Sequence, residues 1–237
     1  MQLREDTARV WEFLKEHPAL TGFVLVGGTA LALHIGHRLS EDLDFSYGEL
    51  RLPRARIDAL RRAGFEHGMS FVANDDPKAI EDFEIGGMDL NNYQQNHLVA
   101  GSVKVTFFCP DPDVQVHIAP GAQSGPRVAT LDEIFAMKCL VSADRSKSRD
   151  WYDLYVLMRD HGFTPERFEE VFVKSRVPHK MDIALSRLCS GRPHQLDEGY
   201  ESLLDIPPSL EQMSEFFIEV ADHARTAAAR RRLKRTS

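Results

Sequence analysis

The clearest pattern of apolar and polar positions lies between residues 23 and 47. Phe23–Val26 is a run of four apolar residues, a length typical of a buried strand. Two glycines follow it, and Thr29–Ile35 then continues with the spacing of a helix. The pattern predicts a strand, a tight turn and a helix, followed by a second strand around Leu43–Ser46.

Helices and a hairpin are predicted around this unit. Apolar positions recur at helical spacing in residues 3–16. A further helix is expected from Pro53, which suits a first helical turn, to Gly64, which suits a helix end. Residues 97–108 predict two strands joined by a short turn at Gly101-Ser102. Other turns are expected at residues 75–77 and 86–87.

The second half of the chain changes to helical spacing. Residues 119–128 are rich in Pro, Gly and Ser and are typical of a linker. Beyond it, helices are predicted from Thr130, from Ser148 to Asp160, from Thr164 and from Ser209. The chain is therefore expected to form an α/β (α+β) protein of two parts. Residues 1–120 would form a mixed sheet with flanking helices, and residues 121–237 a helical domain beside it.

The two glycines at the strand-to-helix turn suit phosphate binding. Gly27 and Gly28 carry no side chains to keep a ligand away, and the helix behind them begins with unpaired N–H groups. The hydroxyls of Thr29 and Ser40 would add hydrogen bonds to a phosphate, or would cap local backbone instead. The glycines would otherwise only end a strand.

A pair of carboxylates follows in the sequence Ser40-Glu-Asp42-Leu-Asp44. Residues two apart in a strand point to the same side, so Asp42 and Asp44 would project together. Hard divalent ions such as Mg²⁺ prefer oxygen ligands of this kind. The alternative is a solvated strand end. A phosphate cradle followed by an acid pair indicates nucleotide chemistry.

A second block of polar residues occupies the predicted helices after residue 130. Lys138 is a point charge suited to a triphosphate, or a lysine extended along a helix border. Asp150 and Asp153 share a face of the following helix, preceded by Arg149. These three residues would form a salt-bridge network between helices, or place an acid near the nucleotide and its acceptor.

The two blocks together resemble the AbiEii/AbiGii-type branch of the nucleotidyltransferase superfamily. The first block is GGTALAL followed by GHR-x-S-x-D-L-D-F, and the second is Lys138 followed by the R-D-x-x-D-L motif at Arg149–Leu154. A glycine pair or a DxD alone is weak evidence, whereas both blocks in this order are fairly specific. By order and separation the resemblance covers roughly residues 20–160.

The resemblance implies a nucleotidyltransferase-like fold with the nucleotide in a cleft between the two domains. It implies transfer of a nucleoside monophosphate from an NTP, with Mg²⁺ (or Mn²⁺), to an RNA hydroxyl such as a tRNA end, or to a protein hydroxyl. The chain would be the toxin of a toxin–antitoxin pair with a separate antitoxin. The catalytic residues would be Asp42, Asp44, Lys138 and Asp150, with Asp42 and Asp44 on the metal. The nucleotide-binding residues would be Gly27, Gly28, Thr29, Ser40, Lys138, Arg149 and Asp153.

One position departs from the pattern that the resemblance implies. Nucleotidyltransferase folds commonly place a third acid on a later core strand, and the matching stretch here offers Thr106. Asp111 and Asp113 lie past that strand, where a loop is expected. The alternative function is therefore a catalytically weak or inactive protein of this fold that binds a nucleotide or RNA.

Composition agrees with an ordinary soluble protein. Of 237 residues 43% are hydrophobic and 27% charged, and no apolar run approaches the length of a membrane span. Three widely spaced cysteines and no signal-peptide pattern favour a reduced, cytoplasmic setting. The net charge is −7, yet residues 225–235 contain six cations and no acid. That basic tail would contact nucleic-acid phosphates or complement the helix dipole.

Overall fold

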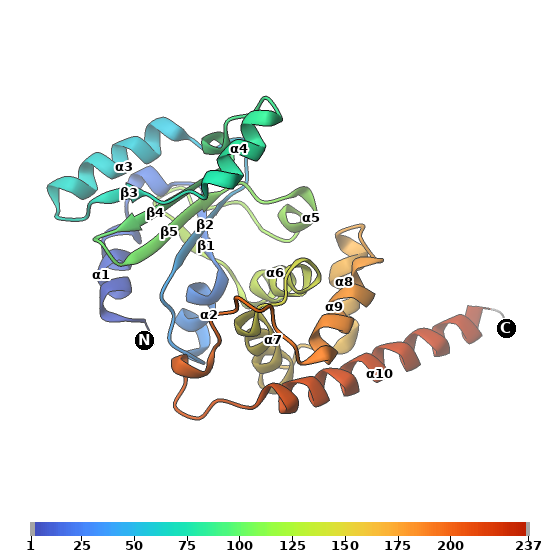
Figure 1. The fold of residues 1–237 in the computed structure, drawn as a ribbon. Helices are drawn as coiled ribbons and strands as arrows, with labels where there is room; N and C mark the ends of the chain where they lie inside the picture. Colours follow the sequence, from blue (N-terminus) through green and yellow to red (C-terminus); the bar gives the residue numbers. More distant parts are fainter. Residues whose placement is uncertain (1–2, 236–237) are drawn as a thin grey trace. The chain divides into compact units, whose positions relative to one another are not determined.

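The computed structural model describes residues 3–235, with side chains for residues 3–226, and they form two compact units (Figure 1). The first unit comprises the described residues up to Asp111 together with Ile118–Leu131. The second comprises Pro112–His117 and the described residues from Asp132 onwards.

A six-stranded mixed sheet forms the first unit, in the order β3-β4-β5-β2-β1-β6. Its strands are β1 (Phe23–Val26), β2 (Leu43–Tyr47), β3 (Phe71–Ala73), β4 (Gln94–Val99), β5 (Val103–Phe108) and β6 (Arg127–Val128). Strand β2 pairs antiparallel with β1 and parallel with β5, and β4 and β5 form the predicted hairpin. The predicted mixed sheet with flanking helices is confirmed.

One face of this sheet is packed with aromatic side chains. The rings of Phe45 and Phe107 lie 5.5 Å apart, and Trp11 stacks on Phe45. Helices α1 (Glu5–Leu14) and α3 (Arg54–Glu66) lie on the same side of the sheet in Figure 1. Because alternate residues of β2 and β5 point away from this apolar layer, Asp44 and Thr106 belong to the opposite face.

Helix α2 (Gly27–Ile35) follows β1 without an intervening loop, so the two glycines form its first turn. Gly36 ends the helix in the left-handed conformation, with φ of 59°. The chain then returns to the sheet as β2, directly beside β1. The short unit β1-α2-β2 thus fixes the positions of the two glycines and of Asp44.

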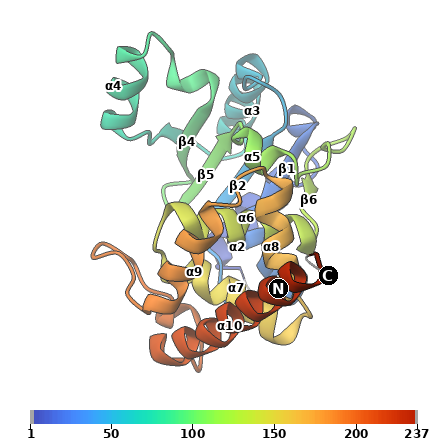
Figure 2. The ribbon, with the colours of Figure 1, turned by 90° about the vertical axis from the view of Figure 1, so that its right-hand side faces the viewer.

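The second unit is helical, as predicted. Its helices are α5 (Pro112–Gln115), α6 (Leu131–Asp144, whose first residue belongs to the first unit), α7 (Ser148–Asp160), α8 (Pro165–Lys174), α9 (Lys180–Ser190) and α10 (Leu210–Arg235), with a 3₁₀ turn η3 (Glu201–Leu203). Helix α10 packs on α7, α8 and α9 (Figure 2). The predicted capping box at its start is present, because Ser209 and Gln212 exchange hydrogen bonds of 2.8 and 3.1 Å.

Several local predictions were wrong. Residues 75–77 begin a helix, α4 (Pro77–Ile85), rather than only a turn, because the Asp76 carboxylate accepts the Lys78 N–H and caps it. Helix α3 continues two residues past Gly64. Asp113 lies in the short helix α5 and not in a loop. The segment predicted as a linker contains β6, which adds a parallel edge to β1.

Helix α4 has no buried residue and stands out from the sheet in Figure 2. It is followed by the 3₁₀ turn η2 (Leu90–Asn92); another, η1 (Pro18–Leu20), precedes β1. Of the basic tail, Arg225 lies 3.4 Å from Asp222, whereas the side chains of Arg230, Arg231, Arg232, Lys234 and Arg235 fall outside the described part. Among residues 3–235, no helix is both long and apolar enough to cross a membrane.

Candidate functional site

The turn between β1 and α2 is built around Gly27. Its φ of +72° lies in the left-handed region, which residues with a Cβ rarely adopt. A Cβ at this position would also lie 2.8 Å from Oδ2 of Asp44. Gly27 therefore leaves the space that the Asp44 carboxylate occupies against the first turn of α2.

Gly28 makes room for a different side chain. A Cβ there would collide with the guanidinium of Arg38, which is buried and donates to the Leu39 carbonyl at 3.1 Å. The sequence interpretation placed a ligand in the space above both glycines. In the structure, the Asp44 carboxylate and the Arg38 guanidinium occupy that space. Arg38 is therefore added to the candidate site residues.

The acid pair lies at the start of strand β2. Leu43 is the first residue of the strand and is buried, Asp44 follows it, and Asp42 directly precedes the strand; both acids are half-buried. That the two carboxylates share a face stays a prediction. Thr29 donates its hydroxyl to the Asp42 carbonyl and lies 2.7 Å from the Ser40 hydroxyl. These two buried hydroxyls tie the Asp42 backbone to the start of α2.

Thr106 occupies the position where a third acid was expected. Strands β2 and β5 pair in parallel with Asp44 opposite Thr106. Within residues 3–235, no three His, Cys, Asp or Glu side chains are grouped so that they could hold a metal ion together. Metal binding by Asp42 and Asp44 therefore stays a prediction.

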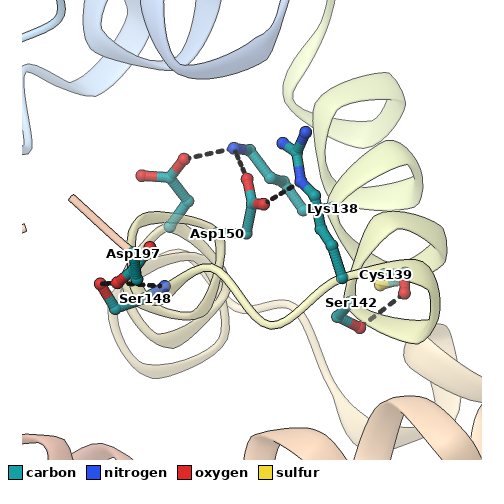
Figure 3. A network of polar contacts seen from close by, with 8 residues as sticks. Lys138, Cys139, Ser142, Ser148, Asp150 and Asp197 are labelled. Carbon is teal, nitrogen blue, oxygen red and sulfur yellow. Dashed lines mark hydrogen bonds and ion pairs between the residues drawn. The ribbon is translucent and has the colours of Figure 1, made fainter. Parts of the chain in front are cut away.

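The second unit contains a buried cluster of opposite charges. Lys138, on α6, places its Nζ 2.6 Å from Oδ1 of Asp150 and 2.6 Å from Oδ2 of Asp153, both on α7. The three side chains are 8%, 3% and 0% exposed. Figure 3 shows Lys138 crossing from its helix to Asp150. Since buried charges are costly without partners, the lysine and the two acids require one another.

Arg145 adds a second positive charge beside the two carboxylates of this cluster. Its Nε donates to Oδ2 of Asp150 at 2.8 Å, while about half of its side chain stays exposed. Burial raises the pKa of the Asp150 carboxyl, but the charges of Lys138 and Arg145 outweigh it, and the pKa lies below its usual value. Asp150 is therefore held as a carboxylate.

Arg149 points away from this cluster, although it belongs to the same sequence motif. Its Nε donates to the Gly199 carbonyl at 2.8 Å, and Nη2 lies 3.4 Å from Glu198. The R-D-x-x-D-L motif therefore makes contacts in two places. Asp150 and Asp153 bind Lys138, whereas Arg149 holds the segment that precedes η3.

The structure groups the predicted residues into two clusters, each within one unit. The first contains Gly27, Gly28, Thr29, Ser40, Asp42 and Asp44, and the second contains Lys138, Asp150 and Asp153, with Arg149 beside it. The prediction of a nucleotide site built from these residues stays a prediction. Arg38 was missed, although it stands inside the GHR stretch of the motif.

The remaining histidines and cysteines do not form a reactive centre among the described residues. His34 contacts the Ala129 carbonyl at 2.7 Å, in agreement with a structural role. The three cysteines are free. Burial raises the pKa of the Cys109 thiol to about 11 and that of Cys139 well above its usual value, so both are poor nucleophiles.

Comparison with known proteins agrees with the sequence resemblance. Residues 12–236 match the family model described as nucleotidyl transferase AbiEii toxin, type IV TA system. An uncharacterised protein of Aquifex aeolicus is 28% identical over 203 residues, which cover 82% of this chain and 84% of that protein.

Two solved structures share the fold. MenT4, a nucleotidyltransferase toxin of Mycobacterium tuberculosis, is 16% identical, with a TM-score of 0.58 over 91% of this chain and 82% of its own. A Helicobacter pylori protein assigned as a nucleotidyltransferase is 19% identical, with a TM-score of 0.53 over 95% and 96%. At these identities the two structures support the fold alone.

The close contact between Gly27 and Asp44 predicts the effect of Gly27→Ala. The added Cβ strains the left-handed backbone and collides with the carboxylate, so the free energy of unfolding should fall by about 2–4 kcal/mol. Gly68→Ala is the matched control, because Gly68 has φ of +71° and nothing near its Cβ position. Equal losses in urea unfolding for the two variants would contradict the packing of Asp44 against this turn.

The buried charge cluster predicts the effect of Lys138→Met. The variant leaves Asp150 and Asp153 without the lysine, and at pH 7 it should lose about 3–5 kcal/mol of unfolding free energy. Because the folded pKa of Asp150 is lowered, the stabilisation is present above the unfolded pKa near 4 and is lost as the pH falls through the folded pKa.

The difference in unfolding free energy between the wild type and Lys138→Met should therefore become smaller below about pH 4. Chemical denaturation from pH 3 to 8 measures it, with the exposed Lys78→Met as the control. A deficit that does not depend on pH would show that Lys138 stabilises the unit through packing rather than through its charge.

Proposed function

We propose a reaction for this chain on the premise that it belongs to the nucleotidyl transferase AbiEii toxin family of type IV toxin–antitoxin systems. The chain transfers a nucleoside monophosphate from an NTP to a hydroxyl group and releases pyrophosphate. One observation carries the proposal. The Asp44 carboxylate packs against the glycine turn that begins α2, and Asp42 stands two residues before it in the chain, directly ahead of β2.

The acid pair fits a divalent metal ion. Mg²⁺ is usually held by one or two carboxylates, with substrate phosphates and water as its other ligands. Asp42 and Asp44 would hold Mg²⁺ or Mn²⁺, and the bound ion would neutralise phosphate charge and activate an acceptor hydroxyl. The Thr29 hydroxyl holds the Asp42 backbone, and the Ser40 hydroxyl lies beside that of Thr29.

The first turn of α2 and Arg38 supply positive potential beside the acid pair. The backbone N–H groups of Gly28 and Thr29 belong to the first turn of a helix, where anions are stabilised. The Arg38 guanidinium lies against the same turn. In the proposed reaction these groups orient the phosphates, and Thr29 and Ser40 hold the loop that carries Asp42.

The second cluster supplies a carboxylate and a lysine to the proposed reaction. Asp150, ionised and hydrogen-bonded to Lys138 and Arg145, is the carboxylate of this cluster that we propose as catalytic. Lys138 stabilises that carboxylate and offsets charge as pyrophosphate leaves. Asp153 fixes the lysine from its other side, and Arg149 holds the backbone of the following segment.

The acceptor is proposed to be an RNA hydroxyl such as a tRNA end, with a protein hydroxyl as the second choice. The family description adds a toxin–antitoxin context, so a separate antitoxin protein is the expected partner. The second candidate function is nucleotide or RNA binding without transfer. Thr106 favours it, because a neutral hydroxyl cannot act as a metal-binding carboxylate or as a general base.

The transfer reaction predicts incorporation of label from one of the four NTPs. The purified chain is incubated with Mg²⁺, total cellular RNA and each labelled NTP, beside Asp42→Asn/Asp44→Asn and Asp150→Asn. We expect label in RNA or protein with the wild type, and a loss of at least about 100-fold in both variants. Asp58→Asn is the matched control, since Asp58 is an exposed acid on α3.

Two outcomes would contradict this proposal. Folded wild-type protein that transfers no label from any NTP would favour the binding function. Transfer that persists in the Asp42→Asn/Asp44→Asn variant would place the metal-dependent chemistry on other residues.

The basic tail predicts a measurable contribution to RNA binding. Truncation after Ala224, a buried residue of α10, removes six cations from residues 225–235. We expect RNA affinity to fall by roughly tenfold or more and its dependence on salt to become shallower. A full-length chain with the six cations replaced by Gln separates charge from length, and unchanged binding in both variants would exclude the tail.

A further inference from the structure

The neutral residue opposite Asp44 is part of a hydrogen-bonded network that crosses the sheet. Strand β5 lies between β2 and β4, so Thr106 has Asp44 on one side and Asn96 on the other. Its hydroxyl lies 3.1 Å from Oδ1 of Asn96 and donates to it. The position expected to hold a carboxylate therefore has a hydroxyl with a defined partner.

Asn96 is itself fixed by the carboxylate of Asp75. Oδ1 of Asp75 accepts from the Asn96 backbone N–H at 2.7 Å and from Nδ2 at 2.9 Å. A carboxylate only accepts, so the amide nitrogen must face Asp75 and the amide oxygen must face Thr106. Gln94 donates to the same oxygen at 3.3 Å, which agrees with this orientation.

The network fixes the direction of the Thr106 hydroxyl. A hydroxyl has one hydrogen and two lone pairs, and here the hydrogen is directed toward Asn96 on β4. The lone pairs are left for the side on which β2 and Asp44 lie. Thr106 is thus presented to the acid pair as a hydrogen-bond acceptor without charge.

We propose that Thr106 is a positioning residue of a one-metal site, held as an acceptor by Asn96 and Asp75. It accepts a hydrogen bond from water bound to a single divalent ion on Asp42 and Asp44. The inference rests on the proposed function only in taking these two acids as the metal-binding pair. Asp75 and Asn96, which the sequence patterns do not single out, become the residues that orient Thr106.

The charge of the site favours one ion. Two carboxylates supply two negative charges, part of which the Arg38 guanidinium beside the same turn offsets, so the fixed charge suffices for no more than one divalent cation. A carboxylate at position 106 would raise the number of negative charges to three, still short of the four positive charges of two divalent ions, and would add a direct ligand for the one ion. Replacing the hydroxyl by a carboxylate should therefore tighten the binding of a single ion.

The test is a titration of the full chain with Mn²⁺ alone, with free Mn²⁺ followed by electron paramagnetic resonance. The wild type should bind one Mn²⁺, and Asp42→Asn/Asp44→Asn should bind none. Thr106→Val removes the acceptor at nearly constant volume and should raise the Kd about tenfold. Thr106→Ser restores the hydroxyl and should bind within about twofold of the wild type.

Three further variants test the network and the charge of the site. Asp75→Ala releases the Asn96 amide and should raise the Kd in the same direction as Thr106→Val, whereas Asp75→Asn keeps an acceptor oxygen and should have a smaller effect. Thr106→Asp adds a direct ligand and should lower the Kd while still binding one Mn²⁺ per chain. Circular dichroism and thermal unfolding show that each variant is folded.

The Mn²⁺ titration tests this inference independently of the transfer reaction. A wild-type Kd in Thr106→Val, or a Kd in Thr106→Asp no lower than that of the wild type, would overturn it, since the network would then only join strands. A wild type that binds no Mn²⁺ would also overturn it. The inference stands when Mn²⁺ binding shows the expected pattern without NTP transfer, in which case the proposed reaction alone fails.

Discussion

The site in the first unit depends on one close contact, that of the Asp44 carboxylate with the first turn of α2. The antiparallel pairing of β1 with β2 sets Asp44 opposite Val26, the residue before the turn. Only a glycine at position 27 permits both the left-handed backbone and the approach of Oδ2. The glycine pair is thus required by the chain's own side chains. A phosphate would approach a surface already shaped by Asp44 and Arg38.

The second unit obeys a different constraint, the cost of burying charge. Lys138, Asp150 and Asp153 have almost no exposed surface, so none can lose its partners cheaply. This reconciles the two interpretations of the R-D-x-x-D-L motif, because an ion-pair network can also hold a carboxylate ionised for chemistry. It also limits Lys138, whose charge is balanced within the cluster. A phosphate near Lys138 would therefore meet a charge that the two acids already offset in part.

Local patterns predicted most of the fold, and only part of the site. The apolar run at Phe23–Val26, the hairpin turn and the capping box at Ser209 depend on neighbouring residues, and the structure contains all three. Helix α4 was missed because Asp76-Pro77 suits a turn and a helix start equally. Residues 127–128 are too short to show a strand pattern. Contacts set by sheet register, such as Thr106 with Asn96, leave no local signal at all.

Because Thr106 is neutral, the site carries less negative charge than a site with three acids would. A triphosphate carries several negative charges, and each fixed carboxylate beside it opposes its binding. Thr106 removes one such charge at the cost of a potential base, because a hydroxyl does not take up a proton at neutral pH. In the proposed reaction, Thr106 would therefore favour binding of the nucleotide over activation of the acceptor. The parallel register of β2 and β5, which sets Thr106 opposite Asp44, fixes this balance.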